Sequence, residues 1–405
     1  MSNTPNIRFK GFTDDWEQRK FGDVGSVAMC KRIFKEQTSE EGDVPFYKIG
    51  TFGGTPDAYI SRELFEEYKK AYQYPSKGDI LISASGSIGR TVEYRGEDEY
   101  FQDSNIVWLK HGDNIDNAFL KVLYSVVEWS CEGSTIKRLY NDNFLKTEFM
   151  LPYIEEQTKI GEFFSQIDNL ITLHQRKCDE TKELKKYMLQ KMFPKNGERV
   201  PEIRFAGFTD DWEQRKLGEM STSFEYGLNV AAKDYDGTNK YIRITDIDDY
   251  SRKFSQEDVT SPDADLSKAE AYKLSEGDIL FARTGASVGK SYIYRASDGL
   301  VYYAGFLIRA KIKPEYNPEF VFQNTLTSDY EKFIKVTSMR SGQPGVNAQE
   351  YSQFEIRVPS KAEQDKIATY LRSLDNLITL HQRKCDDLKE VKKYMLQNMF
   401  PGKEN

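Results

Sequence analysis

The chain contains two nearly identical copies of a helix-forming segment, and this repeat restricts the fold more than any other feature. DNLITLHQRKCD occupies residues 168–179 and recurs unchanged at 375–386, and KKYMLQKMFP at 185–194 returns as KKYMLQNMFP at 392–401. GFTDDWEQRK likewise appears at 11–20 and at 207–216. Such self-similarity predicts two structurally equivalent halves, each made of one globular head and one helical arm.

The repeat divides the chain into four parts. We predict heads at residues 1–151 and 197–358 and arms at residues 152–196 and 359–405. The heads share only a skeleton, including GDIL at 78–81 and at 277–280, whereas the arms are almost identical. Folding alone does not demand identical arms, because a core tolerates many volume-conserving substitutions. The pattern therefore favours two unlike surfaces presented on one pseudo-two-fold frame.

The arms are predicted to be two long antiparallel helices that form a coiled coil. Apolar residues recur at alternating steps of three and four, which is typical of a coiled-coil seam, and Phe-Pro ends each arm. A local two-fold axis would bring His174 and His381 together near the middle of the arms. The predicted seam, which also serves as a candidate partner surface, comprises Ile160, Ile167, Leu170, His174, Leu184, Met188, Ile367, Leu374, Leu377, His381, Leu388 and Met395.

The heads are predicted to be mixed α/β, which makes the whole chain α+β. Strand-like segments lie at 44–52, 78–84, 91–95 and 105–110, with a helix at 117–129. The second head repeats this order with strands near 240–247, 277–283, 291–295 and 301–312 and a helix at 318–333.

Composition argues against several classes of protein. Four cysteines and three histidines give neither a disulfide framework nor a zinc pattern, so no metal site is expected. The apolar runs are too short for a membrane span, and the first residues lack the build of a signal peptide, so we expect a cytoplasmic protein without membrane contact. The net charge of -7 does not exclude nucleic acid, because phosphate binding depends on the local basic surface.

Several motifs together resemble the specificity (S) subunit of a type I restriction–modification system. They are Trp16…Gly22 and Trp212…Gly218, each GDIL with its Gly-rich loop, and the Pro…Glu-Gln…Ile pattern before each arm, at Pro152, Glu156, Gln157 and Ile160 and at Pro359, Glu363, Gln364 and Ile367. The resemblance covers essentially the whole chain. No single motif is specific to this family, but the occurrence of all of them twice, in the same order, is.

The resemblance implies a non-catalytic subunit that recognises double-stranded DNA. Each head, a target-recognition domain, would read one half of a bipartite, asymmetric target. The coiled coil would set the spacer and dock two modification (methyltransferase) subunits, and restriction subunits would translocate and cleave DNA. This chain would then hold no cofactor, and S-adenosylmethionine, ATP and Mg would be bound by the partner subunits.

The candidate DNA contacts lie in polar, glycine-containing loops. Glycine permits close approach of the backbone to phosphate, and arginine supplies charge or a bidentate contact to guanine. An ordinary hairpin turn with solvated basic residues is the alternative. The candidates are Ser85, Ser87, Arg90, Lys137 and Arg138 in the first head and Arg283, Thr284, Ser287, Lys290, Arg340 and Gln343 in the second.

Three other functions fit the sequence less well than DNA recognition. The chain has no Pro-Pro pair, which a methyltransferase of this kind needs in its base pocket. Asp57, Glu67 and Lys69 have a tolerable spacing for a metal-dependent nuclease, but such a site needs Glu and Lys on a strand, and SRELFEEYKKAY favours a helix. A coiled-coil scaffold that binds only protein would explain the arms but not the divergent heads. No catalytic residue is therefore expected.

Overall fold

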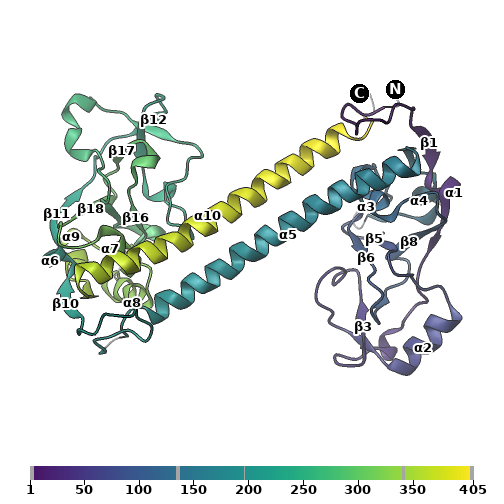
Figure 1. Ribbon diagram of the computed structural model, residues 1–405, viewed down its shortest axis with the longest axis horizontal. Coiled ribbons are helices and arrows are strands. Elements are labelled where there is room, and N and C mark those ends of the chain that lie inside the picture. Colours follow the sequence, from purple (N-terminus) through teal and green to yellow (C-terminus); the bar gives the residue numbers. More distant parts are fainter. Residues whose placement is uncertain (1–3, 134–136, 196, 340–342, 402–405) are drawn as a thin grey trace. The chain divides into compact units, whose positions relative to one another are not determined.

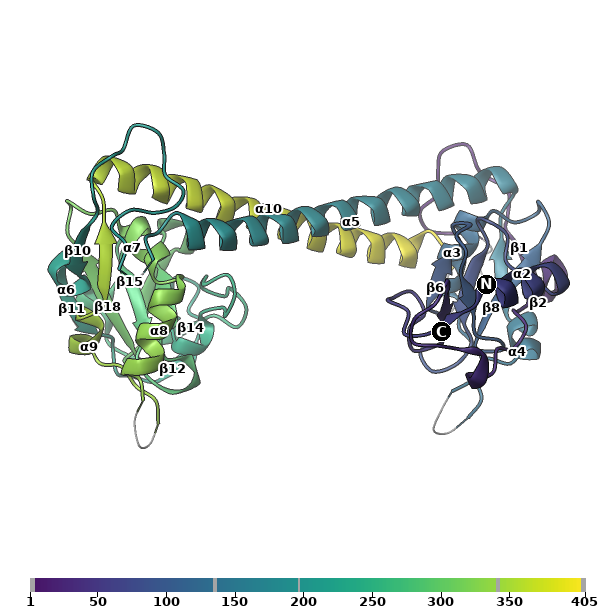
Figure 2. The ribbon, with the colours of Figure 1, turned by 90° about the horizontal axis from the view of Figure 1, so that it is seen from below.

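The computed structural model describes residues 4–133, 137–195, 197–339 and 343–401. The chain forms two compact units (Figures 1 and 2). Unit 1 comprises residues 1–174 and 384–405, and unit 2 comprises residues 175–383. Each unit therefore contains one head together with segments of both arms. The described residues confirm the predicted α+β class.

The arms are two helices of equal length, α5 (Ile154–Lys191) and α10 (Lys361–Asn398), of 38 residues each. They start shortly after Pro152 and Pro359, and neither contains an interior proline to break the hydrogen-bond ladder. Both helices are rich in charged residues. Within the part of the chain that the structure describes, every helix is too short or too polar to span a bilayer.

The two helices run antiparallel in each unit. In unit 1, Lys392 Nζ lies 2.6 Å from Asp168 Oδ1, and Cys385 Sγ lies 4.0 Å from Ile171 O. Residue numbers therefore rise along α5 in the same direction in which they fall along α10. The same holds in unit 2, where Lys185 pairs with Asp375 at 2.6 Å and Cys178 Sγ lies 3.7 Å from Ile378 O (Figure 1). A parallel pair would instead set each cysteine beside its own copy. The approach of His174 to His381 stays a prediction, since these residues belong to different units.

The predicted seam is wrong at three of its twelve positions. Leu170, Leu184 and Leu377 are more than 40% exposed. The buried positions are instead Phe164 and Leu371, and the contacts across the helix pair are made by Ile171, Ile378, Cys178, Cys385, Lys185 and Lys392. The seam therefore begins at Ile160 and proceeds in alternating steps of four and three residues. Every second seam position consequently lies one residue later than predicted, as at Ile171 in place of Leu170. Because Leu170 and Ile171 are both apolar, the sequence pattern did not distinguish the two phases.

The other predicted seam residues face the helix pair or a head. Ile160, Ile167, Ile367 and Leu374 are buried, and His174, Met188, His381, Leu388 and Met395 are partly buried. The seam also carries charge, since Lys185 and Lys392 occupy seam positions and pair with aspartates of the other helix.

Head 1 is built on a four-stranded antiparallel sheet of order β2-β8-β5-β6. Its strands are Gly25–Ala28, Ile106–His111, Ile80–Ser83 and Thr91–Glu93. A second sheet has the order β4-β3-β7, with strands Tyr59–Ile60, Val44–Tyr47 and Tyr100–Phe101. A two-stranded ribbon, β1 (Glu17–Lys20) with β9 (Glu148–Leu151), joins the start of the head to its end. The helices are α1 (Phe21–Val24), α2 (Arg62–Ala71), α3 (Asn117–Val126) and α4 (Asn141–Lys146).

Head 2 repeats this topology in the sheet β11-β18-β15-β16. Its strands are Ser221–Tyr226, Leu307–Ile312, Ile279–Ala282 and Ser291–Ile293. The ribbon of β10 (Glu213–Lys216) and β19 (Glu355–Val358) corresponds to β1 and β9. Two further pairs are β12 (Ala232–Asp234) with β14 (Thr260–Pro262) and β13 (Asn239–Ile242) with β17 (Leu300–Tyr303). The helices are α6 (Leu217–Met220), α7 (Pro318–Asn324), α8 (Ser328–Thr337) and α9 (Ala348–Ser352).

The predicted strands and helices are found in the right order, with shorter ends. Two segments divide, because a turn at 304–306 separates β17 from β18, and a break at 325–327 separates α7 from α8. The helix start at Pro318 is confirmed, since Asn317 accepts a hydrogen bond from Phe320 N at 3.1 Å. α2 is a helix capped by Ser61, so Glu67 and Lys69 are not on a strand. The nuclease hypothesis is therefore wrong.

The end of each arm packs into the core of a head. In unit 1, Phe400 meets the Trp16 ring edge-to-face with centroids 5.8 Å apart. In unit 2, Phe193 meets Trp212 in the same way at 6.3 Å. Both tryptophans are buried and therefore pack in the cores of the heads. The Met-Phe-Pro at the end of each arm thus supplies apolar surface that closes a head core.

Gly161 permits the close approach of α3 to α5 in unit 1. A Cβ at this position would lie 2.6 Å from Phe119 N and 2.7 Å from Ala118 Cβ. Both distances are shorter than real Cβ contacts, and one partner is backbone. The absence of a side chain at Gly161 is therefore a packing requirement of this junction.

We expect Gly161→Ala to destabilise the protein by about 1–3 kcal/mol through overpacking, despite the higher helix propensity of alanine. Thermal unfolding of the full chain measures this effect. Gly50→Ala is the matched control, because a Cβ there meets nothing within 4 Å. Equal unfolding temperatures for the two variants would contradict the packing role of Gly161.

Candidate nucleic-acid interface

A glycine-rich loop follows an inner strand of the main sheet in both heads and has the same backbone geometry in each. It links β5 to β6 in head 1 and β15 to β16 in head 2. Gly86 and Gly89 have φ of 68° and 89°, and Gly285 and Gly289 have φ of 72° and 85°. This left-handed conformation strains residues with a Cβ, so the glycines are required by the turn itself. The backbone of the loops is therefore conserved between heads whose side chains differ.

In head 1 the structure brings together the two candidate loops that the sequence places about 50 residues apart. Ser85 forms a backbone bridge with Arg138, and Gly86 N donates to Lys137 O at 3.2 Å. Ser87, Arg90, Lys137 and Arg138 are exposed, whereas Ser85 is buried. Arg90 donates from Nη1 to Phe52 O at 2.7 Å, which holds its side chain against the head.

Head 2 repeats this association of loops. Thr284 bridges to Gly345, and Gly285 N donates to Pro344 O at 3.1 Å. Gln343 is exposed beside Gly285, and Ser287 is half-buried in the same loop. Arg340 lies outside the described residues. The described candidate residues of each head thus lie in or beside one polar loop cluster, and their contacts with DNA stay a prediction.

The basic residues of the second loop have different environments. Lys290 Nζ lies 2.5 Å from Asp249 Oδ1 and 3.3 Å from Ile247 O, and its side chain is only 14% exposed. This lysine ties the loop to a neighbouring turn of the head. Arg283 instead lies over the rings of Tyr226 and Phe306, with Cζ 5.1 Å and 5.8 Å from their centroids. Arg283 is therefore the better placed of the two for a ligand.

A buried ion pair fixes each head to its arm, and sequence reasoning assigned it no role. Arg8 makes a bidentate contact with Glu156, with Nε–Oε1 and Nη2–Oε2 distances of 2.7 and 2.8 Å. Trp16 Nε1 also donates to Glu156 at 3.2 Å. In unit 2, Arg204 and Glu363 reproduce the bidentate contact with the same two distances. Hydrogen bonding to the carboxylates raises the pKa of Arg8 and of Arg204.

The glutamine that follows each of these glutamates forms hydrogen bonds with buried and partly buried backbone groups at the same junction. Gln157 Oε1 accepts from Asp116 N at 2.9 Å, and its Nε2 donates to Pro152 O at 2.9 Å. Gln364 makes the equivalent bonds to Asn317 N and Pro359 O, both at 2.9 Å. The repeated Glu-Gln pair therefore joins the start of the arm to the N-terminus of a head helix. Ile-Arg-Phe, present at 7–9 and 203–205, is the sequence signal that identifies the arginine partners.

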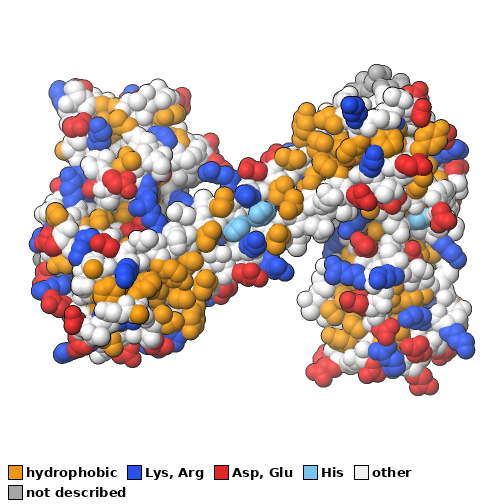
Figure 3. Space-filling model, viewed as in Figure 1, with side chains coloured by type: hydrophobic (Ala, Val, Ile, Leu, Met, Phe, Trp, Pro, Cys, Tyr) orange, Lys and Arg blue, Asp and Glu red, His pale blue; other side chains and the backbone are white. Residues whose placement is uncertain are grey.

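Each unit also exposes apolar side chains on its pair of arm helices (Figure 3). In unit 2 these are Leu184, Tyr187, Leu377 and Leu380, and in unit 1 they are Leu170, Val391 and Tyr394. Every one of them lies one residue before a seam position. On an antiparallel helix pair with this common offset, residues of both helices share one face. We call these residues the apolar face of each unit.

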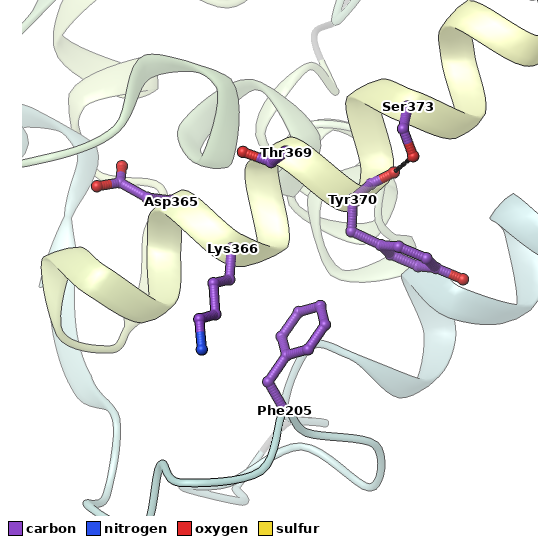
Figure 4. Close-up of a pocket in the computed structure, with 6 residues that line it drawn as sticks. All are labelled: Phe205, Asp365, Lys366, Thr369, Tyr370 and Ser373. Atoms are coloured by element: carbon purple, nitrogen blue, oxygen red, sulfur yellow. Dashed lines mark hydrogen bonds between the residues drawn. The ribbon is translucent and has the colours of Figure 1, made fainter.

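A pocket of about 480 Å³ lies at the head end of the apolar face in unit 2 (Figure 4). It is lined by Phe205, Asp365, Lys366, Thr369, Tyr370 and Ser373. Tyr370 and Ser373 continue the spacing of Leu377 and Leu380 along α10. Asp365 accepts hydrogen bonds from Asn317 and Lys361, and these bonds lower the pKa of its carboxyl group. Ser373 donates a hydrogen bond to Tyr370 O at 2.6 Å. The pocket thus extends an apolar surface and does not assemble catalytic groups.

No cluster of three or more metal-ligating side chains occurs among the described residues. Cys30, Cys131, Cys178 and Cys385, which all lie in the described part of the chain, form no disulfide. Burial raises the pKa of Cys30 to about 12, which keeps it protonated and unreactive near neutral pH.

Comparison with known proteins identifies the family. The type I restriction modification DNA specificity domain matches residues 13–183 and 209–390, which is most of the chain. The chain therefore belongs to the family of type I restriction–modification specificity subunits, the recognition subunits of their complexes and not the catalytic ones.

Individual relatives agree with this assignment. A Haemophilus influenzae protein described as a type I restriction enzyme specificity subunit, S.HindORF215P, is 56% identical over 153 residues, which is 37% of this chain and 40% of that protein. The MjaVIII specificity subunit of Methanocaldococcus jannaschii is 23% identical over 334 residues, covering 80% of this chain and 76% of that protein. The crystal structure of the S subunit from M. genitalium shares the fold, with a TM-score of 0.67 and 16% identity over 99% of this chain and all of that one.

We expect Glu156→Ala to destabilise unit 1 by about 3–5 kcal/mol, because it leaves the Arg8 guanidinium, 14% exposed, without its carboxylate. Glu363→Ala should do the same in unit 2. Glu17→Ala, which removes an exposed partner of Arg19, is the control and should cost about 0–1 kcal/mol. Thermal unfolding, with a double-mutant cycle on Arg8 and Glu156, measures the coupling. A coupling energy between Arg8 and Glu156 that is smaller than that between Arg19 and Glu17 would contradict the stabilising role of the buried pair.

Proposed function

We propose that this specificity subunit reads a bipartite, asymmetric DNA target, with each head contacting one half. The observation that supports this most directly is the loop cluster, which has one backbone geometry in both heads but different side chains. Equivalent frames with unlike surfaces are suited to reading two different sequences. The arm helices would then set the length of the unread spacer.

The apolar faces support docking of two identical partner subunits. Each unit presents the same kind of face, built from copies of the same residues: Tyr187 corresponds to Tyr394, Leu184 to Val391, and Leu377 to Leu170. Exposed aromatic and aliphatic side chains on a charged helix pair are costly in water and are typical of protein interfaces. We propose that one modification subunit docks on each face.

In this proposal the chemistry belongs to the partners. S-adenosylmethionine is bound by the modification subunits, and ATP and Mg are used by the restriction subunits. The contribution of this chain is to position double-stranded DNA relative to them. A scaffold that binds only protein, the alternative function, predicts that complexes containing this chain bind DNA without sequence preference.

The first test exchanges one head. Replacing residues 16–151 with the head of another specificity subunit should change one half of the target and leave the other half intact. This boundary keeps β1 and its partner β9 together, and it leaves Arg8, Glu156 and Gln157 in place. Target sequences are measured by selection from a random DNA library with the reconstituted complex. A change in both halves, or no selectivity in the parent complex, would contradict the proposal.

The second test addresses docking. Tyr187→Asp should weaken binding of one modification subunit by about 30-fold or more, because it places a charge at the centre of an apolar contact. Tyr394→Asp should release the other subunit, and the double variant should release both. Native mass spectrometry gives the stoichiometry, with Tyr250→Asp, at a fully exposed head residue, as the control. Retention of two subunits by the double variant would exclude these faces.

A further inference from the structure

Three residues of head 2 form an exposed cluster where neighbouring strands of the main sheet end. Tyr226 is the last residue of β11, Phe306 precedes β18, and Arg283 follows β15. These strands are adjacent in the sheet, which places the three side chains together. The two rings are exposed by 43% and 53% although they are large and apolar. We call this cluster the aromatic–arginine plate.

The backbone of the plate is held on both sides. Arg283 N donates to Phe306 O at 3.0 Å, and Arg283 O accepts from Val346 N at 2.9 Å. The guanidinium lies over both rings, at 5.1 and 5.8 Å from their centroids. Cation–π contacts restrict the rotamers of the arginine while leaving its N–H donors in the plane of the group. The side chain is thus ordered before any ligand binds.

The charge of Arg283 is not neutralised by a carboxylate of any residue that the structure describes. Glu225 precedes Tyr226 in the sequence, but its carboxylate is paired with the buried Arg309. Lys290 at the other end of the loop is paired with Asp249. Of these two described loop cations, Arg283 is therefore the one whose donors remain for an external acceptor.

We propose that Arg283, held between Tyr226 and Phe306, reads a guanine in the half-target of head 2. This inference rests on the proposed function and names one contact within it. A planar guanidinium donates two parallel hydrogen bonds to O6 and N7 of guanine in the major groove, the commonest base-specific contact of arginine. A phosphate contact needs only charge, whereas a base contact gains from a fixed plane, and the two rings provide that plane.

The described residues of head 1 form no such plate at the corresponding place. The hydrogen bond from Ala84 N to Asn105 O, at 2.8 Å, corresponds to that from Arg283 N to Phe306 O. Ala84 therefore occupies the place of Arg283, and Asn105 that of Phe306. Because the backbones match and the side chains do not, the two heads are expected to read different bases at this position.

The test uses the complex reconstituted with its modification subunits and duplexes that carry each of the four bases at every position of the half-target of head 2. The wild-type complex should prefer guanine at one position by about tenfold or more. Arg283→Ala should remove that preference by weakening the guanine duplex alone. Arg283→Lys should keep part of the affinity and lose the discrimination, since lysine lacks the planar fork. Phe306→Leu should reduce the preference in part.

Replacing this guanine with 7-deazaguanine, which lacks the N7 acceptor, separates base reading from charge. The substitution should weaken the wild-type complex and leave Arg283→Ala unaffected. Lys268→Ala, which removes an exposed cation of the same head, is the control, and thermal unfolding checks that every variant is folded. Equal weakening by Arg283→Ala on all four bases with a smaller salt dependence would indicate a phosphate contact and overturn the proposal, as would no effect. A wild-type complex without any sequence preference would instead refute the proposed function.

Discussion

The buried ion pair between Arg8 and Glu156, with its copy between Arg204 and Glu363, is the interaction on which the rest of each unit depends. A carboxylate that is 1% exposed is stable only when it is paired and hydrogen-bonded. Satisfying Glu156 requires the leading segment, the head and the first turn of α5 to meet in one arrangement. The following glutamine then bonds the backbone where a head helix begins. The surface residues of a head can therefore vary while the geometry of its attachment to the arm helix stays the same.

This junction explains how nearly identical arms coexist with divergent heads. Most residues that form the junction belong to the repeated Ile-Arg-Phe and Glu-Gln segments and not to the divergent surface of a head. The glycine-rich loops, in contrast, keep their backbone through left-handed glycines and leave the other side chains free to vary. The difference between Arg283 in head 2 and Ala84 in head 1 is one result of that freedom.

The arm helices combine two requirements on adjacent stripes. The seam holds the antiparallel pair together and includes two lysine–aspartate pairs, which fix register because each charge has one partner across the pair. The neighbouring stripe exposes leucine, valine and tyrosine in both copies. The exposed apolar residues of both arms are the observation on which the proposed docking of partner subunits rests.

By itself the sequence determined the repeat, the long arms, the α+β class, the order of the four strands and one helix that it predicted in each head, and the family. These follow from periodicity and copy number, which are properties of the chain. Only the tertiary structure decided the phase of the seam, because Leu170 and Ile171 are equally apolar and burial alone separates them. It also decided that Lys290 pairs with Asp249 while Arg283 stacks on two rings, since both are basic loop residues whose partners come from distant segments. The role of Arg8 and Arg204 was not evident for the same reason: a buried ion pair is defined by long-range packing, about 150 residues apart in sequence.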